Sequence, residues 1–154
     1  MPHNLSIVLV TPEIPTNTGS IGRLCLATNS TLHLVDPLGF DINDSRVKRA
    51  GLDYWKHLQM VRHENLKAFF DFLPPNAPTV FFSTKAKFSL FEQRFEKGSY
   101  LIFGCETKGL DENLLKEFSG DTFYIPQYDD RVRSLNLANA ASIAVYEAIR
   151  QLGA

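Results

Sequence analysis

Residues that could bind a ligand or take part in catalysis gather in three short segments of the chain. They are 17–23 (Asn-Thr-Gly-Ser-Ile-Gly-Arg), 103–109 (Phe-Gly-Cys-Glu-Thr-Lys-Gly) and 133–140 (Arg-Ser-Leu-Asn-Leu-Ala-Asn-Ala). The segments combine glycines, small polar side chains, a carboxylate and two arginines. Glycine lets a backbone approach a ligand closely, so this composition suits a neutral or zwitterionic ligand held largely by backbone amides and carbonyls. The pattern favours a nucleotide-like cofactor.

The second and third segments each follow an apolar run of strand length and lead into a helix. The strands are expected at 100–103 and 122–125, and the helices at 111–118 and from about 135 to 152. In an open α/β sheet, ligands bind at the carboxyl ends of neighbouring strands. We therefore expect these two loops to form the floor of the site.

The remainder of the chain alternates between the two kinds of element. Further strands are predicted at 5–10, 32–35, 59–62 and 79–82, with helices from 17, over 44–49 and over 66–73, whereas 88–95 is ambiguous. Pro12 and Pro15 place 11–16 in a loop, so Asn17 or Thr18 is expected to cap the first helix. This order predicts an α/β protein with a mainly parallel sheet and helices on both faces. The length of 154 residues, 44% of them hydrophobic, suits a single domain spanning 1–154.

Composition excludes several classes of protein. No apolar run approaches the roughly 20 residues that span a bilayer, so no membrane association is expected. The N-terminus lacks the features of a signal peptide, and the two cysteines, Cys25 and Cys105, are expected to be reduced thiols, which together predict a cytoplasmic protein. The net charge of −1 is unusual for a nucleic-acid-binding protein, so RNA contacts would require local clusters or joined subunits.

Familiar catalytic and cofactor motifs are missing from the chain. It has no Gly-x-Gly-x-x-Gly, no phosphate-binding loop of the Gly-x-x-x-x-Gly-Lys-Ser/Thr type and no Gly-x-Ser-x-Gly. The four histidines are scattered and neither cysteine has a partner at ligand spacing, so no metal is expected.

The three segments, in this order and at this spacing, resemble the three motifs of the SPOUT superfamily of RNA methyltransferases. The similarity extends over 5–153, and within the superfamily the chain resembles the minimal tRNA 2′-O-methyltransferases that modify the wobble cytidine or uridine. The resemblance implies a deep trefoil knot at the C-terminus, S-adenosyl-L-methionine as cofactor, tRNA as substrate and a homodimer. Two differences are local: the chain between Ile125 and Ser134 is one residue longer than the commoner pattern, and Gln127 replaces methionine.

The resemblance also implies roles for individual residues. Those expected to contact the cofactor are Phe82, Ser83, Gly104, Gly109, Ile125, Ser134 and Leu135, and those expected to take part in catalysis are Arg23, Asn17, Glu106, Ser134 and Asn136. Deprotonating an arginine at pH 7 would cost about 7.5 kcal/mol, so we favour a charged Arg23 that binds a substrate phosphate and stabilises the developing alkoxide. Glu106 could orient Arg23 or a motif loop across the pocket. Simpler roles are a helix cap for Asn17 or Ser134 and a surface carboxylate for Glu106.

RNA contacts are expected from a further set of residues, namely Arg133, Tyr146, Arg46, Lys48, Arg49 and Lys85. Either Arg131 or Arg133 could face the substrate, and core packing is an equal explanation for Tyr146. Two copies of the basic clusters in a dimer could form a track for the anticodon stem-loop, although a solvated surface is the simpler explanation of each cluster. Binding along such a track would weaken as salt rises.

Two other functions remain open at this point. The stretch 16–20 superficially matches the phosphate loop of a flavodoxin-like electron-transfer module that binds FMN at a helix N-terminus. A non-catalytic RNA-binding relative of the same fold is the second alternative, although Arg23, Gly104 and Ser134 are all present.

Overall fold

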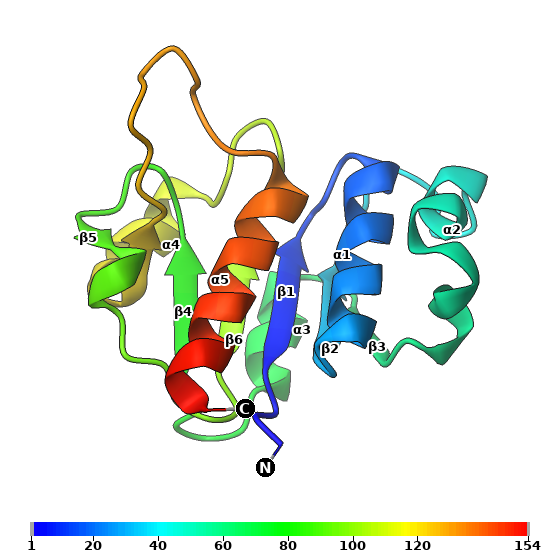
Figure 1. Cartoon of the computed structure of the whole chain (residues 1–154), viewed down its shortest axis with the longest axis horizontal. Coiled ribbons are helices and arrows are strands. Elements are labelled where there is room, and N and C mark those ends of the chain that lie inside the picture. Colours follow the sequence, from blue (N-terminus) through cyan, green and yellow to red (C-terminus); the bar gives the residue numbers. More distant parts are fainter. Residues whose placement is uncertain (1, 154) are drawn as a thin grey trace.

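A seven-stranded parallel sheet forms the middle layer of the protein (Figure 1). The structure is a computed structural model that describes residues 2–153, apart from the side chains of 51–53. The strand order is β3-β2-β1-β6-β4-β7-β5, and each neighbouring pair is parallel. The strands are β1 (Ser6–Val10), β2 (Thr31–Val35), β3 (Met60–His63), β4 (Thr79–Phe82), β5 (Phe88–Ser89), β6 (Tyr100–Phe103) and β7 (Thr122–Tyr124).

Helices cover both faces of this sheet, as predicted. On one face α1 (Pro15–Ala27) and α5 (Leu137–Leu152) pack together, and on the other lie α3 (Leu66–Phe72) and α4 (Glu112–Glu117). Successive strand residues point to opposite faces, so Ile7 and Leu9 of β1 join the α1/α5 cluster whereas Val8 joins the α3/α4 cluster. The shorter α2 (Ser45–Gly51) packs against α1 and continues into the 3-10 helix η1 (Leu52–His57), which was not predicted.

The predicted start of the first helix was wrong. We expected a loop to residue 16 and a cap at Asn17 or Thr18, but α1 begins at Pro15 and both of those residues lie inside it, buried. Proline is well tolerated at the first helical position, because its fixed φ suits a helix and its missing N–H would be unpaired there. The residue before the helix, Ile14, has no capping side chain of its own, and the partner comes from another segment.

The final helix also begins later than predicted. It starts at Leu137, and Asn136 is the N-cap: its side chain accepts hydrogen bonds from the N–H groups of Ala138 and Asn139. Ser134, the cap expected from the sequence, lies two residues earlier. Three alanines of the helix, Ala141, Ala144 and Ala148, are fully buried within this chain, so close packing explains them without a second subunit.

The ambiguous segment after β4 divides into two elements. Phe88–Ser89 forms the edge strand β5, and Leu90–Glu92 forms the 3-10 helix η2, closed by a capping box between Ser89 and Glu92. The last strand, β7, lies between β4 and β5. A late part of the chain is therefore inserted between two strands that an earlier continuous segment contributes.

Two histidines are buried together beneath α3. His33 of β2 and His63 of β3 are 2% and 5% exposed, and a nitrogen of each ring lies 2.9 Å from the other. The aromatic rings of Phe69, Phe72 and Tyr100 surround them. Burial, with a smaller effect from His63, lowers the pKa of His33 to about 4, and burial also lowers the pKa of His63.

This pair predicts that acid weakens the fold. The unfolded chain takes up protons at the ordinary histidine pKa of about 6.5, whereas folded His33 resists protonation until lower pH, so its contribution is complete above about pH 6.5 and is lost as the pH falls toward 4. We expect the free energy of unfolding in urea to fall by about 3 kcal/mol over that range from His33 alone. H33Q should flatten this dependence, and H57Q, which changes an exposed histidine, should keep it. An unchanged slope in H33Q would contradict the prediction.

Candidate active site

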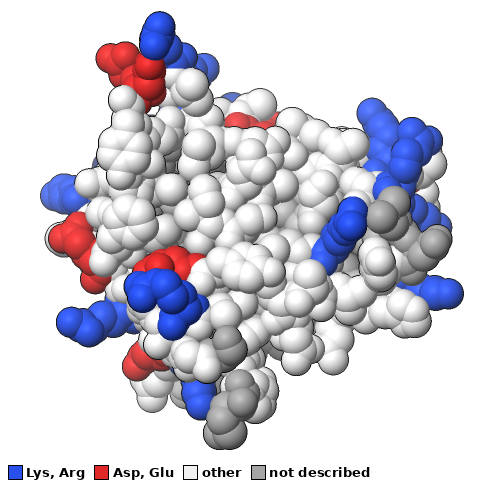
Figure 2. All heavy atoms as spheres, in the orientation of Figure 1, with Lys and Arg blue, Asp and Glu red and all other residues white. Residues whose placement is uncertain are grey.

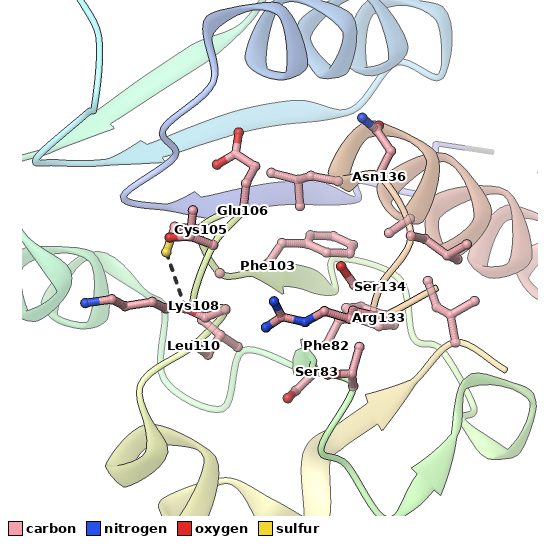
Figure 3. Close-up of a pocket in the computed structure, with 18 of the residues that line it drawn as sticks. Phe82, Ser83, Phe103, Cys105, Glu106, Lys108, Leu110, Arg133, Ser134 and Asn136 are labelled. Carbon is pink, nitrogen blue, oxygen red and sulfur yellow. Dashed lines mark hydrogen bonds between the residues drawn. The ribbon is translucent and has the colours of Figure 1, made fainter. Parts of the chain in front are cut away.

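A cleft of about 810 Å³ opens at the carboxyl ends of β4, β6 and β7. Its size lies within the range of about 300–1,000 Å³ that is typical of small-molecule sites. The loop that joins β7 to α5, residues 125–136, forms one side, and the turn after β6 forms another (Figure 3). The two loops predicted to make the floor of the site therefore do meet around one cavity.

Apolar side chains form one part of the cleft lining, among polar and charged residues. The rings of Phe82 and Phe103, which end β4 and β6, are stacked with centroids 4.7 Å apart and planes 8° apart. Leu110, Ile125 and Leu135 line the same space. Flat and branched apolar groups around a cavity are suited to hold the ring of a nucleoside.

A tight turn over Cys105–Gly109 closes one side of the cleft. The N–H of Gly109 donates to the carbonyl of Cys105 at 2.9 Å, and the Cys105 thiol donates to the carbonyl of Gly109 at 3.7 Å, the dashed line in Figure 3. Gly109 has a φ of +70°, a backbone conformation that strains other residues. Gly104 is packed so closely against this turn that a Cβ on it would lie 2.1 Å from the carbonyl carbon of Gly109.

Glu106 ties this turn to the N-terminus of α1. Its carboxylate accepts hydrogen bonds from the N–H groups of Glu13 and Ile14 at 2.8 and 2.9 Å, and from the Asn17 amide at 3.2 Å. The Asn17 oxygen in turn accepts from the side chain of Asn136, the N-cap of α5, at 3.1 Å. The three segments singled out in the sequence are thus joined by one hydrogen-bonded network beside the cleft.

Glu13 completes the network, although no local sequence pattern indicates such a role for it. Its carboxylate accepts from the N–H and hydroxyl of Thr107 at 2.9 and 2.8 Å, so Glu13 and Glu106 bind each other's loops reciprocally. These bonds from Thr107 hold the pKa of the Glu13 carboxyl below its usual value. The partners are 94 positions apart in the chain, and no periodicity or motif links them.

The network predicts a loss of stability in E106Q. An amide in place of the carboxylate turns one acceptor into a donor facing N–H groups, so one of these groups loses its partner and the unfolding free energy should fall by about 1–3 kcal/mol. Thermal melting followed by circular dichroism measures the effect. The control E112Q changes an exposed carboxylate whose oxygen lies 3.6 Å from Lys85, and it should melt as the parent does. Equal melting of the two variants would show that Glu106 is an ordinary surface carboxylate.

All seven residues predicted to contact a cofactor line this cleft, together with Asn17, Glu106, Asn136, Arg133 and Lys85. Figure 3 shows the side chain of Arg133 extending from the 125–136 loop into the cleft. Arg131 instead pairs with Asp129, so Arg133 is the arginine of this loop that faces the cleft. Among the described residues, Glu106 makes no hydrogen bond to Arg23; its partners lie at the start of α1.

Other predicted residues lie outside the cleft of this chain. Arg23 is exposed on α1, with its guanidinium 5.8 Å from the ring centroid of Tyr54 in η1. Tyr146 is 53% exposed on α5, so the core-packing explanation is wrong. Arg46 pairs with Asp44 at 2.8 Å, and the pair holds the pKa of Asp44 at about 2, whereas Lys48 and Arg49 are exposed on α2. Figure 2 shows Lys and Arg side chains gathered over α2.

The structure argues against the flavin-phosphate alternative. In a flavodoxin-like site, the N–H groups at the start of the first helix would bind an anionic phosphate. Here the N–H groups of residues 13 and 14 already bind the Glu106 carboxylate, which would repel a phosphate. Over residues 2–153, we find no group of three or more His, Cys, Asp and Glu side chains placed to hold a metal. In the same range no helix is long and apolar enough to cross a membrane.

Comparison with known proteins places the chain among methyltransferases. The model of the SpoU rRNA Methylase family matches residues 4–146. A tRNA (cytidine(34)-2′-O)-methyltransferase of Saccharophagus degradans is 45% identical over 151 residues, which cover 96% of each chain. A solved structure from work on the 2-OH methylation of C/U34 on tRNA has a TM-score of 0.95 at 46% identity and covers 99% of each chain. The SpoU methyltransferase AviRb from Streptomyces viridochromogenes, in complex with AdoMet, is 27% identical with a TM-score of 0.85, over 99% of this chain and 62% of that one.

Proposed function

We propose that this chain, which belongs to the SpoU rRNA Methylase family, methylates the ribose 2′-hydroxyl of the wobble cytidine or uridine in tRNA, with S-adenosylmethionine as methyl donor. Membership of the family confirms the resemblance of the three sequence segments. The observation that carries the proposal is the full-length similarity to tRNA (cytidine(34)-2′-O)-methyltransferases, at 42% identity over 96% of both chains for the relative from Burkholderia cenocepacia. The chain is an enzyme that acts on tRNA ribose.

The cleft supports the cofactor assignment. Its volume of about 810 Å³ and the apolar part of its lining suit a nucleoside, and the turn at Gly104–Gly109 offers backbone groups at close range. We assign the adenosine to the space between Phe82, Phe103, Ile125 and Leu135, with Ser83 and Ser134 as polar contacts at its edge. When bound, the cofactor would supply an electrophilic methyl group on a sulfonium.

The cleft of one chain lacks one residue that the family resemblance implies for catalysis. Arg23, the expected catalytic residue, lies outside that cleft, on an exposed side of α1. We propose that the working unit is a homodimer in which Arg23 of one subunit reaches the cleft of the other. There its charged guanidinium holds a substrate phosphate and stabilises the negative charge that develops on the 2′-oxygen as its proton leaves.

RNA binding is proposed for the basic surface over α2. Lys48 and Arg49 are exposed there without a described carboxylate partner, in contrast to Arg46 and Lys85, which pair with Asp44 and Glu112. In a dimer, two such surfaces and the two Arg133 side chains would flank the clefts and suit the anticodon stem-loop. The exposed Tyr146 would face the same RNA.

We also propose that the C-terminal part of the chain forms a trefoil knot. Two observations support it: β7 lies between β4 and β5, and beyond it Gln151 of α5 exchanges hydrogen bonds with the N–H of Phe95 and the carbonyl of Gln93. The strand β7 therefore lies between two strands of the earlier segment 79–95, and the helix α5, which follows β7, is hydrogen-bonded to the same segment. A crystal structure whose backbone becomes a straight line, with no knot left, when its two ends are drawn apart would contradict this proposal.

The test of function is incubation of the purified protein with tRNA and S-adenosylmethionine labelled in the methyl group. We expect the label in 2′-O-methylcytidine or 2′-O-methyluridine from the wobble position, found by nucleoside analysis after digestion. A protein that binds the cofactor and RNA without transferring label would instead be the non-catalytic RNA-binding relative. Label in another nucleotide would contradict the assigned substrate position.

A further inference from the structure

Tyr128 is the most exposed of the described large apolar side chains. It is 90% exposed, whereas the next, Phe91, is 64% exposed. It lies on the 125–136 loop, the segment that stands clear of the other elements at the top of Figure 1. An aromatic ring this exposed beside a cleft is a candidate for contact with a ligand.

The loop that carries Tyr128 is shaped by its own hydrogen bonds. The Gln127 amide donates to the carbonyl of Val132 at 3.0 Å, which bridges the loop. Asp129 accepts from both the N–H and the guanidinium of Arg131, and this pairing raises the pKa of Arg131. The turn holds Tyr128 outside the core, with its side chain largely exposed.

The loop also borders two hollows at once. A second hollow of about 800 Å³ adjoins the cofactor cleft; Thr84, Ile125, Gln127 and Arg133 line both, and Tyr128 lines the second. A nucleotide whose ribose reaches the methyl group at the mouth of the cleft must place its base nearby. The second hollow is the adjoining space. Two aromatic side chains line it, the partly buried Tyr124 at the end of β7 and the exposed Tyr128 on the loop, and Tyr128 is the one whose ring is free to stack on a ligand.

Charge on the loop favours a base over a phosphate. The carboxylates of Asp129 and Asp130 balance the guanidiniums of Arg131 and Arg133, so the loop has no excess positive charge to attract the RNA backbone. The face of a nucleobase is uncharged, and unpaired bases stack on tyrosine in single-stranded RNA sites.

We propose that Tyr128 stacks on the base of the nucleotide whose ribose is methylated and thereby places its 2′-hydroxyl at the cleft. This inference rests on the proposed function and adds a residue that determines how the target nucleotide is held. The ring is required and the hydroxyl is not, so phenylalanine should replace tyrosine without loss.

The experiment compares Y128A, Y128F and the parent for binding to an anticodon stem-loop, measured by fluorescence anisotropy. We expect Y128A to bind about 10-fold more weakly and Y128F to bind as the parent does. The same comparison is then made with a stem-loop that lacks the base at the wobble position. On that RNA the difference between Y128A and the parent should vanish, because no base is left to stack.

The matched control is F91A, which removes an exposed aromatic ring from η2 and should leave binding unchanged. S-adenosylmethionine affinity and melting temperature should be the same in Y128A as in the parent. Equal binding of Y128A and parent to the intact stem-loop, or a difference that persists without the base, would overturn the proposal. Methyl transfer by the parent is measured separately, so a parent that binds the stem-loop but transfers no label would overturn the proposed function alone.

Discussion

Alanine at position 104 is expected to abolish measurable binding of S-adenosylmethionine. The added Cβ would lie 2.1 Å from the carbonyl carbon of Gly109, 2.3 Å from the nitrogen of Leu110 and 2.5 Å from the carbonyl oxygen of Gly109. These are backbone atoms, so no side chain can rotate away and the whole turn must shift. The turn forms one side of the cleft and carries Glu106, which binds the start of α1, so the displacement would change both the cavity and the network.

Isothermal titration calorimetry measures this loss, and melting temperature shows whether the variant is folded. Overpacking commonly costs about 1–3 kcal/mol, so G104A should melt at lower temperature than the parent but still be folded. The matched control is G120A, since nothing lies within 4 Å of a Cβ at Gly120 and that residue is not among those that line the cleft. Parent-like affinity in G104A would show that the turn can move without affecting the cofactor site.

Lysine at position 23 is expected to lower turnover by about 100- to 1,000-fold while leaving cofactor affinity unchanged. Lysine keeps the positive charge but lacks the planar guanidinium, which can donate two parallel hydrogen bonds to a phosphate. Cofactor affinity should persist because Arg23 is not among the residues that line the cleft of its own chain. Single-turnover methylation of tRNA and calorimetric titration of the cofactor separate the two effects. Wild-type turnover in R23K would remove Arg23 from the catalytic residues.

A mixed dimer tests whether Arg23 acts on its own cleft or on that of the partner. L135W fills the cleft with a bulky ring and should be inactive by itself. In a dimer of one R23K and one L135W subunit, purified with two different tags, action across the interface leaves one complete site and about half of the parent activity. Action within one chain leaves no complete site. An inactive mixed dimer would therefore contradict the proposed arrangement.

Much of the sheet could be predicted from sequence because its strands are short apolar runs between strong turn signals. The bounds of β4 and β6 were correct to the residue, and β3 was shifted by one position. The residues that line the cleft could be predicted to lie together because a parallel sheet brings the carboxyl ends of β4, β6 and β7 to one edge. The resemblance to a known family supplied the chemistry.

What failed depended on contacts between distant segments. We placed the start of α1 at a residue able to cap it, whereas the cap comes from Glu106, 92 positions away from Ile14. For α5 either of two nearby polar residues, Ser134 or Asn136, could serve, and the cap is Asn136, which also bonds to Asn17. Local propensity cannot rank such choices, because the deciding partner is defined only once the sheet has formed.

The insertion of β7 between β4 and β5 has a consequence for the protein during its synthesis. On the ribosome, the strands on either side are made about 30 to 40 residues before β7, and β5 has no other neighbour in the sheet. In a nascent chain, the position between β4 and β5 therefore stays unfilled until residues 122–124 have emerged. Cofactor binding, which needs the 125–136 loop, should therefore be absent from chains that end before this loop.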